Sequence, residues 1–302
     1  MHSPKIHTID LNFQGIPGAI GVFFIPFNGG GALVECGPGS TLPSLINGLE
    51  QFNISPPDIS DVLLTHIHLD HAGSAGWWAN QGSRIHVHHI GAPHMHNPEK
   101  LLASAGRIYG ELMDKLWGDF LPVPEHKLNI LYDGDELTLG DLTICAIDTP
   151  GHANHHMSYL LGETCFSGDV GGVHLQGTKA IRLPTVPPEF DPELWSQSLQ
   201  KFHNEKISAF ATTHFGIHKD ASWHLGELEK FLDEIIDWMD KIMPLAPTKE
   251  ELRKEYSGWI EKRSSIANLS REKKKAFELA ISSQMSADGI FRYWNKKHSV
   301  TI

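Results

Sequence analysis

The feature that most constrains this chain is a group of histidines and an aspartate directly after an apolar run. Residues 61–65 read DVLLT, and His66, His68, Asp70 and His71 follow within the next six positions. Such a short apolar run predicts a buried strand. Neutral imidazoles together with a carboxylate suit Zn²⁺, Fe²⁺ or Mn²⁺. We therefore expect a metal site where the chain leaves this strand.

Three later segments repeat the same arrangement of a strand followed by a metal-binding side chain. The predicted strands are 142–148 before His152, 164–167 before Asp169, and 207–212 before His214. Ligands at strand ends are held on rigid elements, which favours a well-ordered site. The recurrence in four segments makes a chance motif improbable and predicts one composite site.

Composition indicates what such a metal would do. A chain of 302 residues can bury a core without a metal or disulfides to stabilise it, so a metal here is expected to serve chemistry. The three cysteines lack metal-ligand spacing, which argues against a zinc module or a disulfide framework. The chain holds 20 histidines, and only their positions can identify ligands among them.

The apolar pattern predicts strands and helices in the first two thirds of the chain and helices alone after about residue 221. We expect a domain over 1–221 and a helical extension over 222–302 that packs on or near the site. Further strands are expected at 5–13, 19–27, 32–36, 84–88, 128–131, 136–139 and 157–161. Helices are expected at 42–52, at 98–117, from 191, and at 222–243, 248–264, 270–285 and 287–297.

The motifs taken together resemble those of the metallo-β-lactamase superfamily. They are His66-x-His68-x-Asp70-His71, TPGH at 149–152, SGD at 167–169 and TTH at 212–214. The resemblance extends over about residues 5–220 and is strongest to the branch that contains glyoxalase II. It implies an α/β (α+β) fold, a four-layer αβ/βα sandwich, here with a C-terminal helical extension.

The resemblance also implies a site with two divalent metal ions, with zinc as the first expectation and iron or manganese as alternatives. The implied ligands are His66, His68 and His152 for the first metal, Asp70, His71 and His214 for the second, and Asp169 between them. A hydroxide bridging two such ions would attack a small ester, thioester, lactone or phosphoester. Asp70 would orient this nucleophile as a catalytic residue.

Three further residues are candidates for substrate binding. Trp77 begins the helix after the metal motif, and His174 and Arg182 lie beyond Asp169 on a segment expected to face the metals. Arg182 could hold a carboxylate or phosphate in a bidentate contact. Two of them have an ordinary alternative: core packing for Trp77 and a surface ion pair for Arg182. His156 is expected to support the site through hydrogen bonds rather than to bind metal.

Other functions remain open from the sequence. In a mononuclear iron dioxygenase similar to persulfide dioxygenase, His66, His152 and Asp169 would bind one Fe²⁺. A nuclease is disfavoured by charge: residues 246–302 carry 12 Lys and Arg against 7 Asp and Glu, leaving −16 for the remainder of a chain of net charge −11. A purely structural metal is the weakest interpretation. Structural zinc sites are closed to water, whereas the carboxylate-bridged ligand set expected here leaves room for it.

The same patterns lead to expectations about partners and location. We expect a small-molecule substrate and no nucleic-acid or membrane partner, since the chain has no run of 18 apolar residues. No secretory signal is apparent at the N-terminus, so the cytoplasm is expected. The basic helical tail could bind substrate carboxylates, as in glyoxalase II. Alternatively it could cap the pocket or mediate a homodimer, with its basic face in solvent.

Overall fold

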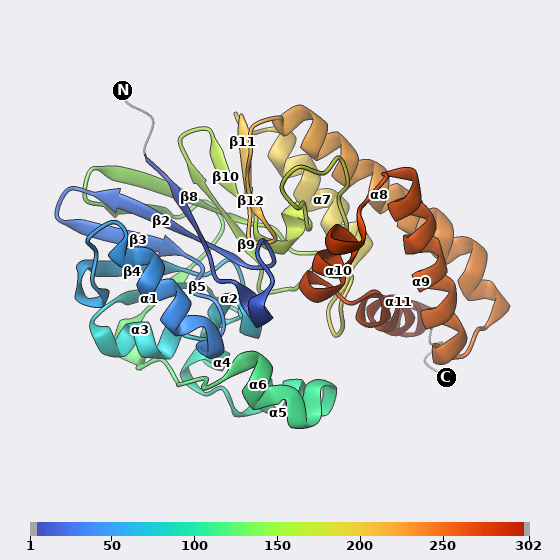
Figure 1. Ribbon diagram of the computed structural model, residues 1–302, viewed down its shortest axis with the longest axis horizontal. Helices are drawn as coiled ribbons and strands as arrows, with labels where there is room; N and C mark the ends of the chain where they lie inside the picture. The colour runs from blue at the N-terminus through green and yellow to red at the C-terminus, as the bar shows by residue number, and fades with distance from the viewer. Residues whose placement is uncertain (1–4, 299–302) are drawn as a thin grey trace.

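The computed structural model describes residues 5–298 as two six-stranded β-sheets covered by helices (Figure 1). The first sheet has the order β1-β2-β3-β4-β5-β6 and the second β12-β11-β10-β9-β8-β7. The first contains β1 (His7–Asp10), β2 (Gly21–Phe27), β3 (Gly30–Val34), β4 (Ile59–Leu63), β5 (Arg84–His88) and β6 (Leu128–Leu131). The second contains β7 (Glu136–Leu139), β8 (Leu142–Asp148), β9 (Met157–Leu161), β10 (Thr164–Phe166), β11 (Ala209–Thr212) and β12 (Gly216–His218).

Strand direction changes within each sheet. In the first sheet β1, β2 and β3 pair antiparallel, and β3 to β6 pair parallel, with Leu33 opposite Val62. The second sheet is antiparallel except for the parallel pair β10 and β11. Parallel strands are normally covered on both faces and read as apolar runs. This explains why β4 and β11 were apparent in the sequence.

Helices cover the outer face of each sheet and complete a four-layer sandwich. The helices of the first half are α1 (Leu42–Glu50), α2 (Leu69–Ala72), α3 (Ala75–Gln81), α4 (Ala92–His96), α5 (Glu99–Tyr109) and α6 (Met113–Trp117). Those of the second half are α7 (Pro192–His203), α8 (Ala221–Ile242), α9 (Lys249–Ile266), α10 (Arg271–Ala280) and α11 (Ser283–His298). The α/β sandwich with C-terminal helices expected from the sequence is therefore confirmed.

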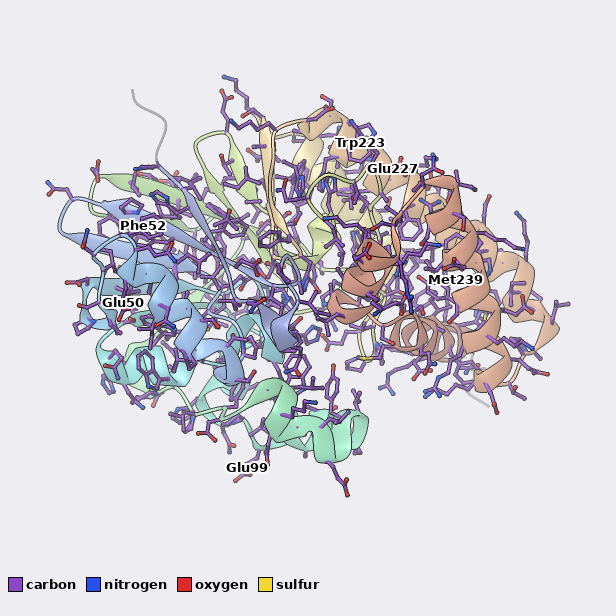
Figure 2. All side chains as sticks on the ribbon, in the orientation of Figure 1. Glu50, Phe52, Glu99, Trp223, Glu227 and Met239 are labelled. Atoms are coloured by element: carbon purple, nitrogen blue, oxygen red, sulfur yellow. The ribbon has the colours of Figure 1, made fainter. Side chains whose placement is uncertain are left out.

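Three apolar clusters hold these layers together. One lies between the sheets and joins Phe23 and Leu63 of the first sheet to Tyr159 and Phe166 of the second. A second packs helices α1 and α3 against the first sheet, and a third packs α7, α8, α9 and α11 against the second. Figure 2 labels one member of each outer cluster, Phe52 and Met239. Helices α8, α9 and α11 thus share one core with the second sheet, whereas α10 packs in a smaller cluster with Val173 and Leu175.

Two local details differ from the expected elements. The single helix expected at 98–117 is interrupted, because Gly110 adopts φ 51° between α5 and α6. A glycine accepts this left-handed value at little cost, and it breaks the helix there. The short strand β12 was not expected, because three residues carry no readable periodicity. None of the described helices is both long and apolar enough to cross a membrane.

Candidate metal centre

The metal-binding side chains singled out in the sequence meet where four strands from both sheets end. After β4 the chain turns into α2, which places Asp70 and His71 in its first turn. His152 follows β8. Asp169 lies in the short 3₁₀ turn Gly168–Gly171 after β10, and His214 follows β11. One edge of the sandwich therefore gathers ligands that are far apart in the sequence.

Four of these side chains form what we term the first group: His66, His68, His152 and Asp169. The Nε2 atoms of His66 and His152 each lie 2.9 Å from Nδ1 of His68. Oδ2 of Asp169 lies 3.3 Å from Nε2 of His152. Three imidazole nitrogens and one carboxylate oxygen thus converge on a single point.

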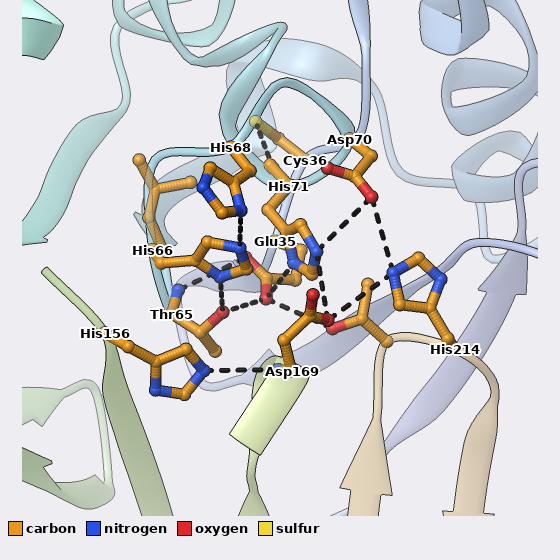
Figure 3. A network of polar contacts seen from close by, with 12 residues as sticks. Glu35, Cys36, Thr65, His66, His68, Asp70, His71, His156, Asp169 and His214 are labelled. Carbon is orange, nitrogen blue, oxygen red and sulfur yellow. Dashed lines mark hydrogen bonds and ion pairs between the residues drawn. The ribbon is translucent and has the colours of Figure 1, made fainter. Parts of the chain in front are cut away.

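The second group contains Asp70, His71 and His214 (Figure 3). Nε2 of His71 lies 3.6 Å from Oδ2 of Asp70, and Nε2 of His214 lies 3.4 Å from the same oxygen. Oδ1 of Asp169 is 3.3 Å from His71 and 3.5 Å from His214. The two oxygens of Asp169 therefore face different groups. We call the seven residues together the ligand cluster.

The hydrogen bonds around the cluster leave nitrogen lone pairs directed at these points. Nδ1 of His152 donates to the Pro184 carbonyl at 2.7 Å, and Nδ1 of His214 donates to the Ala19 carbonyl at 2.7 Å. A neutral imidazole that donates from Nδ1 carries a lone pair on Nε2. In their neutral forms, both rings therefore present a lone pair on Nε2 to the carboxylate of Asp169.

Such an arrangement of lone pairs and carboxylate oxygens repels itself unless a cation lies between them. Nε2 of His71 and Oδ1 of Asp169 are buried and have no hydrogen-bond partner among the described residues. Buried polar atoms without partners are costly and rare in native proteins. The donor set is thus the one that a borderline divalent ion prefers, and the cluster is suited to holding metal ions.

Glu35 fixes the orientation of His71, a member of the second group. This fully buried carboxylate accepts a hydrogen bond from Nδ1 of His71 at 2.9 Å. It also accepts from the hydroxyls of Thr65 and Thr213. A carboxylate that holds Nδ1–H of a histidine presents Nε2 to the metal and makes it a better ligand. Glu35 therefore acts on the geometry of the site through His71.

His156 supports Asp169 in a similar way. Its Nε2 accepts from the backbone N–H groups of Asp169 at 3.2 Å and of Val170 at 3.4 Å, and its Nδ1 contacts the Thr149 hydroxyl at 2.9 Å. These contacts require a lone pair on Nε2 of His156, and they anchor the turn that carries Asp169. It does not belong to either group of the ligand cluster.

Burial and mutual charge set the protonation of the cluster. Burial is the main cause that lowers the pKa of the first-group histidines, to about 3 for His68. Burial also acts downward on His71 and His214, but the nearby carboxylates outweigh it and raise the pKa of both. Burial acts upward on Asp70, but the two imidazoles outweigh it and lower its pKa to about 2. The carboxylates are thus ionised at neutral pH, as metal ligands must be.

A pocket of about 430 Å³ opens directly onto the cluster. His68, Asp70, His152, Asp169 and His214 contribute to its floor. Its walls come from α5 and α6 on one side and from the end of α10 and the start of α11 on the other. This size lies within the range of sites for small organic ligands.

The structure does not bring Trp77, His174 or Arg182 to the lining of this pocket. Trp77 packs against Trp78 in the cluster beneath the first sheet. His174 stacks on His218 with ring centroids 3.6 Å apart. Arg182 is buried, and its guanidinium contacts Glu278 at 2.7 Å. The part of this segment that carries His174 and Arg182 packs away from the pocket, whereas Pro184, a little further along, contacts His152 of the cluster.

The residues that do line the walls were not recognised as functional from the sequence. Leu101, Ala105, Ile108 and Leu116 face the pocket, and they belong to the apolar stripe noted at 98–117. An amphipathic stripe indicates a face that avoids water but does not show whether protein or ligand covers it. Tyr109 and His155 also reach the pocket without any motif that marks them.

A family model described as the metallo-beta-lactamase superfamily matches residues 16–214. A metallo-beta-lactamase fold-containing protein of Sulfurisphaera tokodaii is 29% identical over 52% of this chain and 60% of its own length. An atrochrysone carboxyl ACP thioesterase of Aspergillus fumigatus is 31% identical over 48% of this chain and 35% of its own. A hydroxyacylglutathione hydrolase of Aeromonas salmonicida is 31% identical over 39% of this chain and 38% of its own.

These matches span between about a third and three fifths of the lengths of the three relatives. Among solved structures, an archaeal metallo-beta-lactamase superfamily protein from Sulfolobus tokodaii aligns with a TM-score of 0.67. It covers 95% of this chain and 98% of its own at 19% identity, so the likeness concerns the fold. The alignment extends beyond the family match and includes the C-terminal helices.

Proposed function

Because the chain belongs to the metallo-beta-lactamase superfamily, we propose that it is a metal-dependent hydrolase of a small ester or thioester. The observation that carries the proposal is the convergence of seven ionisable side chains into two groups that share Asp169. Lactones present the same carbonyl carbon and phosphoesters present a phosphorus centre, and both belong to the same test. Two of the relatives carry the names of hydrolytic enzymes, which supports this class of reaction.

In this proposal each group of the cluster holds one divalent ion. His66, His68 and His152 would bind the first, Asp70, His71 and His214 the second, and Asp169 both. Metal ions in such a site lower the pKa of water and stabilise the negative charge that develops on an attacked oxygen. Zinc is the first candidate, because imidazole and carboxylate ligands suit it.

The chain's own residues would position the reactants. Asp70 is ionised, lines the pocket and can accept a hydrogen bond from the attacking water molecule. Glu35 and His156 hold His71 and the Asp169 turn in place, so little reorganisation is needed during the reaction. The pocket walls would exclude bulk water from the attacked carbon.

The experiment that tests the proposal is the metal content per chain, measured by elemental mass spectrometry on protein purified without a chelator or a histidine tag. We expect about two equivalents of zinc, manganese or iron, together with hydrolysis of activated esters or thioesters. One equivalent of iron alone, with oxygen uptake in the presence of glutathione persulfide, would favour the mononuclear dioxygenase instead. Protein that retains two metals but hydrolyses no ester, thioester, lactone or phosphoester would contradict the proposed function.

A further inference from the structure

Two helical segments that supply no metal ligand form opposite sides of the pocket above the cluster, and residues 184–189 complete its lining. We call α5 and α6 the insertion wall, and residues 278–285 at the junction of α10 and α11 the tail wall. The two walls meet where the hydroxyl of Tyr109 donates to Sδ of Met285 at 3.7 Å. Figure 1 shows α5 and α6 below α2, and α10 and α11 to its right. The pocket is therefore complete only when the tail supplies its wall.

Both walls are mainly apolar. The insertion wall presents Leu101, Ile108 and Leu116 to the pocket, and the tail wall presents Leu279, Ile281 and Met285. Ile108 is 46% exposed, and together with its apolar neighbours in the lining it forms a contiguous apolar surface of the kind that marks ligand-binding grooves. Binding to an apolar lining of this kind is favoured by apolar ligand groups, because these groups leave water when they enter the pocket.

Charged groups in the lining are few, and most have partners within the protein. Outside the ligand cluster, Lys100 is the single lysine or arginine among the described residues that line the pocket. Glu278 pairs with Arg182, and Glu189 accepts from the backbone N–H of Asn154 and lies 3.6 Å from His155. The pocket thus offers little to bind a substrate with several carboxylates.

The basic residues of the tail point away from the pocket. Arg253 pairs with Asp288, Arg263 with Glu227, and Lys274 with Glu261. None of these cations belongs to the lining. The tail therefore contributes an apolar wall, and these three cations are used in ion pairs between helices.

We propose that the pocket selects esters or thioesters whose acyl group is an apolar chain of medium length, held between the insertion wall and the tail wall. The inference rests on the proposed hydrolase function, and it adds the class of substrate. The carbonyl carbon would lie at the ligand cluster, and the chain would extend from there between the two walls. A polar thioester with two carboxylates, such as S-lactoylglutathione, is a poor match to the same lining.

The test uses the metal-loaded full-length protein and a series of p-nitrophenyl esters: acetate, butyrate, hexanoate and octanoate. Each buried methylene group contributes about 0.8 kcal/mol, or about fourfold in kcat/KM. We expect kcat/KM to rise by about 10²-fold from acetate to hexanoate, and S-lactoylglutathione to be a slower substrate than an S-hexanoyl thioester. A flat or falling series would overturn the inference.

Two matched variants separate the pocket from the surface. Ile108→Glu places a charge in the insertion wall, and we expect it to reduce the hexanoate-to-acetate ratio of kcat/KM by about 10-fold. Leu112→Glu introduces the same charge at a residue of the same segment that is 52% exposed and outside the lining. This control is expected to keep the ratio of the unchanged protein. Equal ratios in both variants would contradict the assignment of the wall.

A binding measurement keeps this inference distinct from the proposed function. Octanoate and acetate are titrated into the protein while the fluorescence of its tryptophans, which include Trp117 in the lining, is recorded. Tighter binding of octanoate without hydrolysis of any ester would support the pocket and contradict the hydrolase. Hydrolysis without dependence on chain length would support the hydrolase and contradict the pocket.

Discussion

The ligand cluster and the pocket walls lie side by side, but they are encoded in different ways. The cluster comes from short motifs at the ends of strands, where each side chain has a required chemical identity. The walls come from α5, α6, α10 and α11, where only apolar character is required. In the proposed function, the chemistry would thus be set by motifs, whereas the choice of substrate would be set by helices that carry no motif.

The largest effect is expected from Asp169, because its two oxygens face both groups. Asp169→Ala removes the shared ligand, so we expect loss of at least one metal equivalent and of about 10³-fold or more in kcat/KM. The size follows from metal ions contributing several kcal/mol of transition-state stabilisation. Metal content and ester hydrolysis measure the two effects separately.

The matched control for this variant is another titratable residue outside the cluster. His126 is exposed, so His126→Ala should leave metal content and activity unchanged. If Asp169→Ala kept two metals and full activity, this result would contradict the claim that the motifs encode the chemistry.

A smaller effect is expected at Glu35, which touches the cluster without belonging to its two groups around Asp169. Glu35→Gln keeps the shape of the side chain but removes the charge that holds Nδ1–H of His71. Loss of such a supporting partner typically lowers metal affinity by 10- to 100-fold. Competition with a chromophoric chelator measures this affinity. Unchanged affinity in a folded variant would show that the charge of Glu35 is not needed.

The ligand cluster could be predicted from the sequence because strand ends and residue types carry the information. His66, His152 and His214 each follow a short apolar run that predicts a buried strand, and the fold brings such ends together. Glu35 was visible in the sequence, but its contact with His71 depends on packing between β3 and α2 that no local pattern shows.

The walls could not be predicted, because an apolar residue looks the same whether it faces a core or a ligand. Ile108 and Leu112 lie in one apolar stripe, yet only Ile108 reaches the pocket. The break at Gly110 separates them, and its effect on direction appears only in three dimensions. Arg182 shows the converse case: a substrate contact and an ion pair were both open for it from the sequence, and in the structure it pairs with Glu278 of the tail.

Arg182 connects the segment beyond Asp169 to the tail wall. The side chain is buried, and it contacts Glu278 at 2.7 Å and the Ser264 hydroxyl at 2.9 Å. Arg182→Met removes both contacts but retains apolar volume, so we expect the free energy of unfolding to fall by about 1–3 kcal/mol. Urea unfolding measures the change, and metal content should stay near that of the unchanged protein.

The control for Arg182 is a cation of the same segment in an exposed ion pair. Lys179 lies 3.9 Å from Asp220, and both side chains are exposed. Lys179→Met should change the free energy of unfolding by less than about 1 kcal/mol. Equal losses in the two variants would mean that the contact with Glu278 does not anchor the tail wall.

The smallest effect is expected at Glu193, which joins α7 of the body to α11 of the tail. Its carboxylate pairs with the ammonium of Lys297 and accepts from the hydroxyl of Tyr293. Partial burial acts upward on the pKa of Glu193, but these two contacts outweigh it and lower the pKa to about 2. Both members of the ion pair are about half exposed, so screening limits its contribution to about 0.2–1 kcal/mol.

The sign of the pH dependence follows from this lowered pKa. An unfolded glutamate titrates near pH 4.3, so the contact stabilises the fold fully above that pH. The contribution is lost as the pH falls from about 4.3 toward 2, where the folded carboxylate takes up its proton. Glu193→Gln should therefore differ most from the unchanged protein at neutral pH and least near pH 2, and 1 M salt should reduce the difference. A difference that grew on acidification would show that this link between body and tail does not depend on the charge of Glu193.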